Sequence, residues 1–185
     1  QAAGSHAISF EATSTPGAAI ATLTRTLDPV SDVSVLVVGF PGAVQAIAFA
    51  DNNRAPIAGQ TRVRFVNASS DDAAYDVYAG DTKLVTALAA RTASAYFPLS
   101  AGTYTITFRN PTTGATALTI ADQALGEGRV LTCYAAGAAG PVDHRVERAR
   151  AGGGRVLRIQ RQHEHARGTV SAQRAHFSEP LRRKG

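Results

Sequence analysis

Apolar and polar residues alternate with a period of two along most of the first 140 residues of this chain. In the clearest case, Val63 and Phe65 fall on one face of an extended segment, and Arg62 and Arg64 fall on the other. This alternation is typical of a strand with one buried face. Similar segments recur about every ten residues between turns rich in Gly, Pro and Asn, which indicates an all-β sandwich or barrel. The expected strands cover residues 62–67, 74–78, 83–88, 94–97, 103–108, 117–120 and 130–134.

An internal repeat becomes visible when the chain is compared with itself at an offset of 98 residues. Residues 3–10 then align with residues 101–108, both ending in an alternating segment that closes on Phe. Further along, Leu27, Val33, Gly39 and Gly42 align with Leu125, Leu131, Gly137 and Gly140. Small, apolar and glycine positions keep their order, which is the sign of a repeated structural unit.

The repeat predicts how the chain is organised. Residues 1–53 correspond to the C-terminal half of a first sandwich repeat, whose other half is expected before Gln1. Residues 54–60 form a Pro-containing linker, residues 61–140 a second repeat, and residues 141–185 a basic tail. We therefore expect immunoglobulin-like antiparallel β-sandwich repeats, one partial and one nearly complete, with a poorly structured basic C-terminal tail.

The positive charge of the chain belongs to this tail. Residues 1–140 carry eight Lys or Arg against ten Asp or Glu, whereas residues 141–185 carry eleven against four. Ten of those eleven cations are Arg, and Val156–Ile159 is the one convincing apolar cluster. A GC-rich message that is translated out of frame gives this composition, so we hypothesise that the tail is disordered or frame-shifted. Translating the coding DNA in its other two frames tests the second idea, which fails if neither frame restores a strand like residues 43–49.

Composition also limits the classes of function. One cysteine excludes an intrachain disulfide, and the Cys and His spacing matches no structural zinc site. No apolar run reaches the ~18 residues that a membrane-spanning helix needs. No signal peptide is recognisable after Gln1. We expect no cofactor and no transmembrane segment.

With the repeat laid out, the chain resembles the bacterial family called domain of unknown function 4397. The resemblance covers residues 1–140, and its motifs are Val35–Gly39, Ala46–Asn53, Thr61–Ser69, Asp76–Tyr78, Thr92–Tyr96 and Ser100–Ile106. It implies exported sandwich modules arranged in tandem, at the cell surface or in the periplasm. It implies no known activity and supplies no catalytic or binding residues. The chain departs from the family pattern in the loop Ser70–Asp72, which lacks Pro, and from Asp143 onward, where an apolar strand is usual.

Several polar clusters are candidate sites, and each also has a structural interpretation. Asp71 and Asp72, with Asn67 and Ser69, could bind Ca²⁺, as could Asp51–Asn53. In both places we favour a turn whose short polar side chains bond their own backbone, because the spacing matches no calcium loop. The tripeptide Asn67-Ala68-Ser69 fits the glycosylation pattern but coincides with a strand end, so we interpret it as structural.

Two further candidates involve sulfur and imidazole. Cys133 alternates with Leu131 and Ala135, so we expect it to point into the core. His163-Glu164-His165 offers two metal ligands in the tail, which is a poor site. No Ser/His/Asp motif lies in the strand-to-helix context that a catalytic nucleophile needs, so we expect that the protein is not an enzyme.

These observations favour an exported, non-catalytic module that acts as a surface or periplasmic spacer, adhesion or protein-interaction domain. The partner is an unidentified protein or surface glycan, and unpaired strand edges could also allow self-association. The first alternative is a carbohydrate-binding module, with Tyr75, Tyr78 and Tyr96 as the possible ligand-facing residues. The second is polyanion binding through the Arg-rich tail. No motif predicts specific nucleic-acid recognition.

Overall fold

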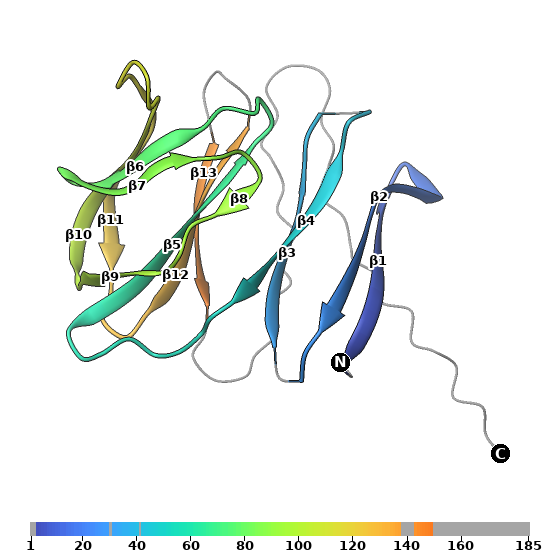
Figure 1. The fold of residues 1–185 in the computed structure, drawn as a ribbon, viewed down its shortest axis with the longest axis horizontal. Coiled ribbons are helices and arrows are strands. Elements are labelled where there is room, and N and C mark those ends of the chain that lie inside the picture. The colour runs from blue at the N-terminus through green and yellow to red at the C-terminus, as the bar shows by residue number, and fades with distance from the viewer. Residues whose placement is uncertain (1–2, 30, 41, 138–142, 150–185) are drawn as a thin grey trace. The chain divides into compact units, whose positions relative to one another are not determined.

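The computed structural model describes residues 3–29, 31–40, 42–137 and, for the backbone alone, 143–149. All regular structure in these residues is β-strand (Figure 1). The predicted all-β class is therefore confirmed. Since these residues contain no helix, none of them forms a helix able to cross a membrane.

The described residues divide into two compact units. Unit 1 comprises residues 3–31 and 35–48, and unit 2 comprises residues 32–34 and 49–149, with the gaps given above. Each unit has a hydrophobic core of its own.

Unit 2 is a β-sandwich of two sheets. The first sheet, sheet C, has the order β13-β12-β5-β8, and β9 also pairs with β5. Its strands are β5 (Gln60–Ser69), β8 (Thr92–Ala93), β9 (Phe97–Ser100), β12 (Val130–Gly137) and β13 (Asp143–Ala149). The second sheet, sheet D, has the order β11-β10-β6-β7. Its strands are β6 (Tyr75–Ala79), β7 (Thr82–Leu88), β10 (Gly102–Arg109) and β11 (Thr116–Leu125).

The inward-facing residues of both sheets form one core. Phe65 of β5 lies edge-on to Phe108 of β10, with ring centroids 6.2 Å apart, and Phe108 is also edge-on to Tyr75 of β6 at 6.3 Å. Edge-to-face packing at these distances is the favoured geometry for aromatic pairs. The alternation predicted from the sequence is what places these rings in the same layer. The other buried members are Val63, Val77, Ala79, Leu88, Ile106, Leu118, Ile120, Leu125, Leu131, Cys133 and Ala135.

A parallel ladder joins the first strand of unit 2 to one of its last. β5 and β12 pair in register from Arg62↔Val130 to Ser69↔Gly137. The other described ladders of unit 2 are antiparallel. At the start of the ladder, the amide of Arg62 and the hydroxyl of Thr61 both donate to the carbonyl of Arg129, at 2.8 and 2.9 Å.

Unit 1 contains two hairpins. One is formed by β1 (Gly4–Ala12) and β2 (Thr15–Leu27), and the other by β3 (Asp32–Val38) and β4 (Gln45–Asp51). Residues 32–34 at the start of β3 and residues 49–51 at the end of β4 belong to unit 2. Ile8, Phe10 and Ala21 form the buried cluster of unit 1. Its partly buried neighbours are Ile20, Val35, Val44 and Ala46.

The first four strands, β1–β4, correspond to the last four, β10–β13, at the offset of 98 residues. β3 begins at Asp32 and β12 at Val130, while β4 (Gln45–Asp51) and β13 (Asp143–Ala149) match at both ends. The hairpin registers match where Gly4 pairs with Leu27 and Gly102 pairs with Leu125, but they differ by one residue after a register shift between Tyr104 and Ile106. The described residues of unit 1 contain no strands that correspond to β5–β9 of unit 2.

Two details differ from the sequence prediction. β13 continues the strand series beyond residue 140, where we expected the repeat to end. It lies at the edge of sheet C, and edge strands accept charged side chains because one side of their ladder is open. Second, residues 94–96 are not a strand: they separate β8 from β9. There the Ser94 hydroxyl accepts from the amide of Phe65 at 3.0 Å, in place of a ladder carbonyl. Residues 150–185, with Val156–Ile159 and His163–His165, lie outside the described residues.

Replacing Phe108 by alanine should destabilise unit 2 by about 3–5 kcal/mol, because the ring is fully buried and its removal leaves a cavity. Phe40→Ala is the matched control, since Phe40 is 49% exposed and its loss should cost less than about 0.5 kcal/mol. Urea denaturation followed by far-UV circular dichroism measures both. Equal losses would contradict the assigned core.

Candidate functional site

The most elaborate polar arrangement in the described residues lies on the outer face of β5. Arg62 and Arg64 are two residues apart and so share the face that points away from the core. Both guanidinium carbons lie 5.0 Å from the centroid of the Tyr96 ring. We call these three residues, with the segment Phe49–Arg54 that they hold, the junction cluster.

Arg64 is the buried centre of the junction cluster. Its Nη2 donates to Asp51 Oδ1 at 2.6 Å and to Thr132 Oγ1 at 3.2 Å, and its Nη1 donates to the Ala50 carbonyl at 3.0 Å. The ring of Phe49 lies 5.9 Å from the guanidinium carbon. Arg64 is only 2% exposed, although the sequence alternation placed it correctly on the outer face. Its Nε has no hydrogen-bond partner among the described residues.

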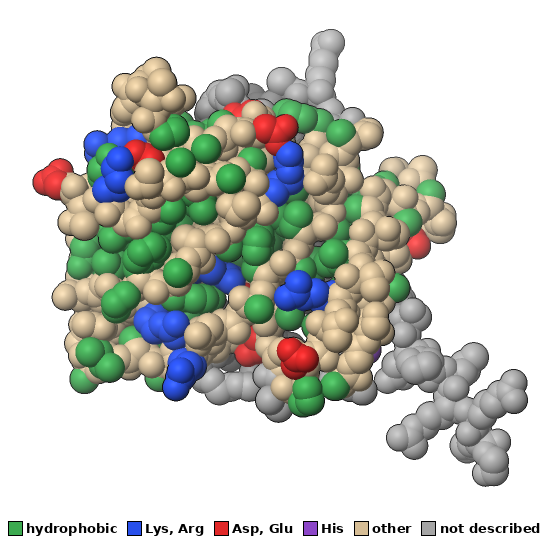
Figure 2. Space-filling view, in the orientation of Figure 1, with side chains coloured by type: hydrophobic (Ala, Val, Ile, Leu, Met, Phe, Trp, Pro, Cys, Tyr) green, Lys and Arg blue, Asp and Glu red, His purple; other side chains and the backbone are tan. Residues whose placement is uncertain are grey.

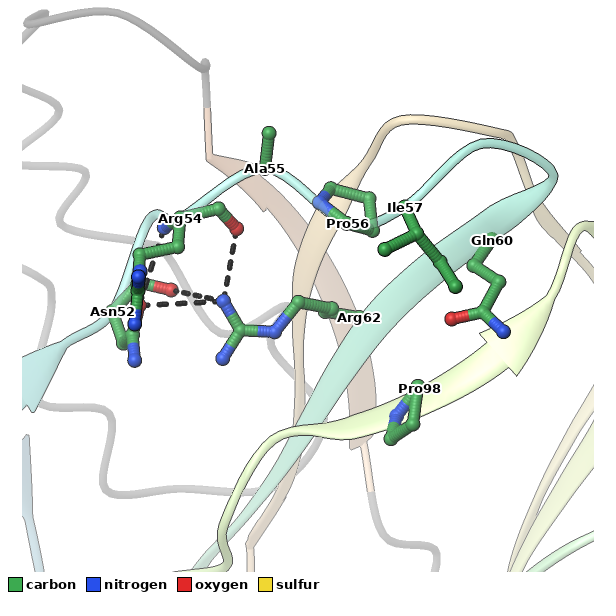
Figure 3. Close-up of a pocket in the computed structure, with 8 residues that line it drawn as sticks. All are labelled: Asn52, Arg54, Ala55, Pro56, Ile57, Gln60, Arg62 and Pro98. Carbon is green, nitrogen blue, oxygen red and sulfur yellow. Dashed lines mark hydrogen bonds between the residues drawn. The ribbon is translucent and has the colours of Figure 1, made fainter.

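Arg62 holds the next part of the same segment. Its Nη1 donates to the Arg54 carbonyl at 2.9 Å and to the carbonyl and side-chain oxygens of Asn52 at 3.3 Å (Figure 3). Beside it lies an open hollow of about 290 Å³. The hollow is lined by Asn52, Arg54, Ala55, Pro56, Ile57, Gln60, Arg62 and Pro98. No carboxylate, imidazole or thiol is among these residues, so the hollow offers no acid or base for proton transfer.

Asp51–Asn53, a calcium candidate in the sequence, is occupied by protein contacts. Asp51 accepts from Arg64 and, through Oδ2, from the Ser34 hydroxyl at 2.8 Å. The Asn53 amide donates to Asp32 Oδ2 at 2.7 Å. These bonds use the carboxylate oxygens that a cation would need.

The loop after β5 likewise bonds its own backbone. Asn67 donates from Nδ2 to the carbonyls of Ala73 and Leu88, at 2.7 and 3.0 Å, and its Oδ1 accepts from the amide and hydroxyl of Ser69. Asp71 Oδ1 accepts from the Ala73 amide at 3.2 Å. Asn67 is fully buried, so the glycosylation pattern is structural, as interpreted from the sequence. In the described residues, no three His, Cys, Asp or Glu side chains are grouped so as to hold a metal ion.

A second polar cluster lies on the outer face of sheet D. Arg109 lies over the ring of Tyr78 at 4.2 Å, and the Lys83 ammonium lies 5.4 Å from the same ring. Lys83 also forms an ion pair with the buried Asp76, whose Oδ1 accepts from the Ala87 amide at 2.9 Å. The hydrogen bond from Lys83, assisted by that amide, lowers the pKa of Asp76, and the same bond raises the pKa of Lys83. The sequence analysis missed this cluster, although the alternation of Asp76 and Tyr78 with core residues could have indicated it.

The three candidate tyrosines are not brought together. Tyr75 is buried in the core of unit 2, so it is unavailable to a surface ligand. Tyr78 is half-buried on the outer face of sheet D, whereas Tyr96 is half-buried in the junction cluster beside sheet C. The period of two explains the first difference, because Tyr75 shares its face of β6 with Val77 and Tyr78 does not.

Cys133 is a core residue, as its alternation predicted. It is buried among apolar neighbours in unit 2. Burial raises the pKa of its thiol to about 12. The group therefore stays protonated near neutral pH and is a poor nucleophile.

Comparison with known protein families identifies the family of this chain. The model of the family described as "Domain of unknown function (DUF4397)" matches twice, at residues 1–74 and 63–148. The chain belongs to this family. Neither the curated proteins nor the solved structures contain a match. The family match thus reaches beyond residue 140 and includes nearly all of β13.

Replacing Arg64 by alanine should destabilise unit 2 by about 3 kcal/mol, because Asp51 and the Ala50 carbonyl lose a buried charged partner. Arg64→Lys should recover only part of the loss, since an ammonium lacks the planar fork and its stacking on Tyr96. Arg54→Ala is the control: Arg54 is exposed, and the change should stay within about 0.5 kcal/mol. Equal losses for Arg64→Ala and Arg54→Ala in urea denaturation would show that the junction cluster contributes nothing.

Proposed function

We propose that this member of the family is a non-catalytic adhesion or protein-interaction module of an exported protein. The observation that carries the proposal is that β5, the first strand of sheet C, begins at the end of the sheet at which its edge strand β13 ends. This arrangement favours the interaction role over that of an extended spacer.

Strand register gives the positions of entry and exit. Arg62, near the start of β5, lies opposite Val130, and Val130 lies opposite Ala149 at the end of β13. Neighbouring strands are about 4.8 Å apart, so the start of β5 and the end of β13 lie roughly 10 Å apart on either side of β12. A spacer gains length when its two connections are at opposite ends. Here the start of β5 and the end of β13 lie at the same end of sheet C, and Arg62 and Arg64 additionally hold the segment before β5 against the sheet.

The opposite end of the sandwich carries three loops that are free of these connections. Residues 70–74, 89–91 and 110–115 follow or precede strand ends that pair at Asn67↔Thr92, Tyr75↔Leu88 and Arg109↔Thr116. Loops held at one end of a rigid sandwich are a common place for recognition. We call them the distal loops.

The distal loops are ordered by their own contacts. Asp72 and Arg91 form an ion pair, and the Arg91 amide donates to the Asn67 carbonyl at 2.7 Å. Both residues have positive φ, 57° and 60°, which is unfavourable for side chains with a Cβ. Backbone held in such conformations recurs at binding loops, where preorganisation lowers the entropic cost of association.

The way the described polar groups are used supports a non-catalytic role. The buried acid Asp76 is paired with Lys83, and Asp51 is paired with Arg64. Each pair also binds backbone of the module, which ties its charge to the fold rather than to a reacting group.

The two alternatives have less support. A sugar-binding face needs an open aromatic ring, but the Tyr78 ring is already covered by Arg109 and approached by Lys83. Figure 2 shows the described Lys and Arg side chains of the visible face in small separate groups, some with an acidic side chain beside them, and this arrangement favours no extended polyanion patch there. The Arg-rich tail that suggested polyanion binding lies outside the described residues.

The test uses beads that carry the full chain through a C-terminal tag. They are offered surfaces coated with the chain itself, with neutral and acidic polysaccharides, and with heparin. We expect binding to the protein surface, and a loss of at least about tenfold with Asp72→Asn combined with Arg91→Asn. Asparagine tolerates positive φ, so this variant should remain folded.

The matched control changes one acid and one arginine at the entry end, Asp81→Asn with Arg129→Asn. Both side chains are exposed, and the control should bind as the original chain does. Binding to polysaccharide alone, binding to heparin alone, equal weakening by the two variants, or no binding to any surface would each overturn the proposal.

A further inference from the structure

We propose that the open hollow beside Arg62 binds an acyl amino acid that has an aliphatic side chain and a free carboxylate. This group is found at the C-terminus of a polypeptide and in free N-acyl amino acids. The lining residues of the hollow all belong to unit 2. The proposal is independent of the distal loops, and capture of a chain terminus is one of the recurring modes of peptide recognition.

The hollow has a cationic side and an apolar side. Figure 3 shows Arg54 and the end of Arg62 on one side, and Pro56, Ile57 and Pro98 on the other. Ile57 is 70% exposed, so its side chain is available to a ligand. Ligand pockets combine an apolar lining with a few polar groups that fix the orientation of the ligand. The ligand of this hollow should therefore carry an anionic group and an apolar group.

Arg62 presents an unused edge of its guanidinium. Its hydrogen bonds to the described residues all come from Nη1, and its guanidinium carbon lies 5.0 Å from the centroid of the Tyr96 ring. Figure 3 shows the other amino group and Nε turned away from the Arg54 carbonyl. Nε and Nη2 form a planar pair of donors that a carboxylate accepts in a bidentate way. Because Nη1 and the Tyr96 ring already fix the guanidinium, a carboxylate can bind without ordering this side chain.

The charge at the hollow is positive. Among the described residues, no acidic side chain lines it. The Arg54 guanidinium is exposed and forms no hydrogen bond or ion pair with the described residues, so a second cation is available to the ligand. An anionic group bound here replaces only water on both guanidinium groups, and the complementary charge favours its binding.

The backbone around the hollow is fixed before any ligand binds. The Gln60 amide donates to the Ile57 carbonyl at 3.1 Å, and the Gly59 amide donates to Glu127 Oε1 at 2.7 Å. The Gly59 carbonyl in turn accepts from the Ala101 amide at 2.9 Å. A preformed wall lowers the entropic cost of binding.

The size of the hollow limits the ligand. Its volume of about 290 Å³ is at the lower end of the range for ligand pockets, about 300–1,000 Å³. Such a volume suits one terminal residue better than a longer segment. A terminal residue carries its carboxylate and its side chain on the same Cα atom, so the two groups reach the cationic and apolar sides together. An internal Asp or Glu needs a neighbouring residue for the apolar contact.

Fluorescence anisotropy of labelled peptides tests the proposal with the full chain. The probe is fluorescein-Gly-Ser-Gly-Ala-Leu with a free C-terminal carboxylate. One control peptide is the same sequence with a C-terminal amide, and the other is the free acid that ends in Ser in place of Leu. We expect each control peptide to bind at least about tenfold more weakly than the probe, because each lacks one of the two contacts.

Substitutions of exposed residues test the hollow itself. Arg54→Gln removes the second cation, and Ile57→Ser removes part of the apolar side. Each should weaken binding of the probe at least about fivefold. Arg129→Gln is the matched control and should bind the probe as the original chain does, since Arg129 is also exposed but does not line the hollow.

Competition with unlabelled ligands separates the two sources of the ligand. Displacement of the probe by unlabelled Gly-Ser-Gly-Ala-Leu at least about tenfold better than by N-acetylleucine would support a chain terminus. Equal displacement by the two competitors would support a free acyl amino acid at the same site.

Several results would overturn the proposal. They are equal binding of the probe and its amide, equal binding of the Leu and Ser peptides, and no binding of the probe at millimolar concentrations of the chain. Equal weakening by Arg54→Gln and Arg129→Gln would also overturn it, as would unchanged binding by Ile57→Ser. The chain with Asp72→Asn and Arg91→Asn should bind the probe normally, so failure at the hollow and failure of the distal loops can be distinguished.

Discussion

The parallel ladder between β5 and β12 connects segments that lie 68 residues apart in the chain. Closing a loop of this length costs conformational entropy that local hydrogen bonds do not recover. The cost is offset because the ladder brings Phe65 and Cys133 onto one face, where they pack against Phe108 and Ile106 of the opposite sheet. Sheet C, the core of unit 2 and the position of both connections all depend on this pairing.

The same ladder creates the surroundings of Arg64. With β12 beside β5, Thr132 is within hydrogen-bond reach of the guanidinium, and the incoming segment supplies Asp51 and the Ala50 carbonyl. A buried arginine is tolerated because three oxygens and two aromatic rings replace water around it. The junction cluster therefore fixes the incoming segment on unit 2, and it explains why a charged residue occupies a fully covered position.

Comparison with known proteins contributes the family of this chain and no more. It assigns the fold family, but it brings no activity, and the functional argument depends on geometry alone. The distal loops of unit 2 carry that argument. They support surface recognition by ordered loops.

Much of the fold followed from local pattern. Alternation placed Val63, Phe65 and Cys133 in the core, and the offset of 98 residues aligned Gly4 and Leu27 with Gly102 and Leu125, which form the corresponding pairs of the two hairpins. The prediction of ligand-facing residues did not separate Tyr75 from Tyr78. Both are tyrosines of one short strand, and only their positions in the alternation distinguish the buried ring from the surface ring. The sequence prediction also ended the repeat at residue 140, because a loss of apolar residues was taken as the end of the strands. The edge strand β13 lies beyond that point, since an edge strand needs only its backbone partner.

The sequence by itself determined the all-β class, the inward faces of the strands and membership of the family. These are local properties, since a side chain's face is set by its position in a pleated strand. Only the tertiary structure decided that Arg64 is buried and that β5 begins at the end of sheet C at which β13 ends. Each of these depends on which distant segments come together, and a period of two contains no information about that.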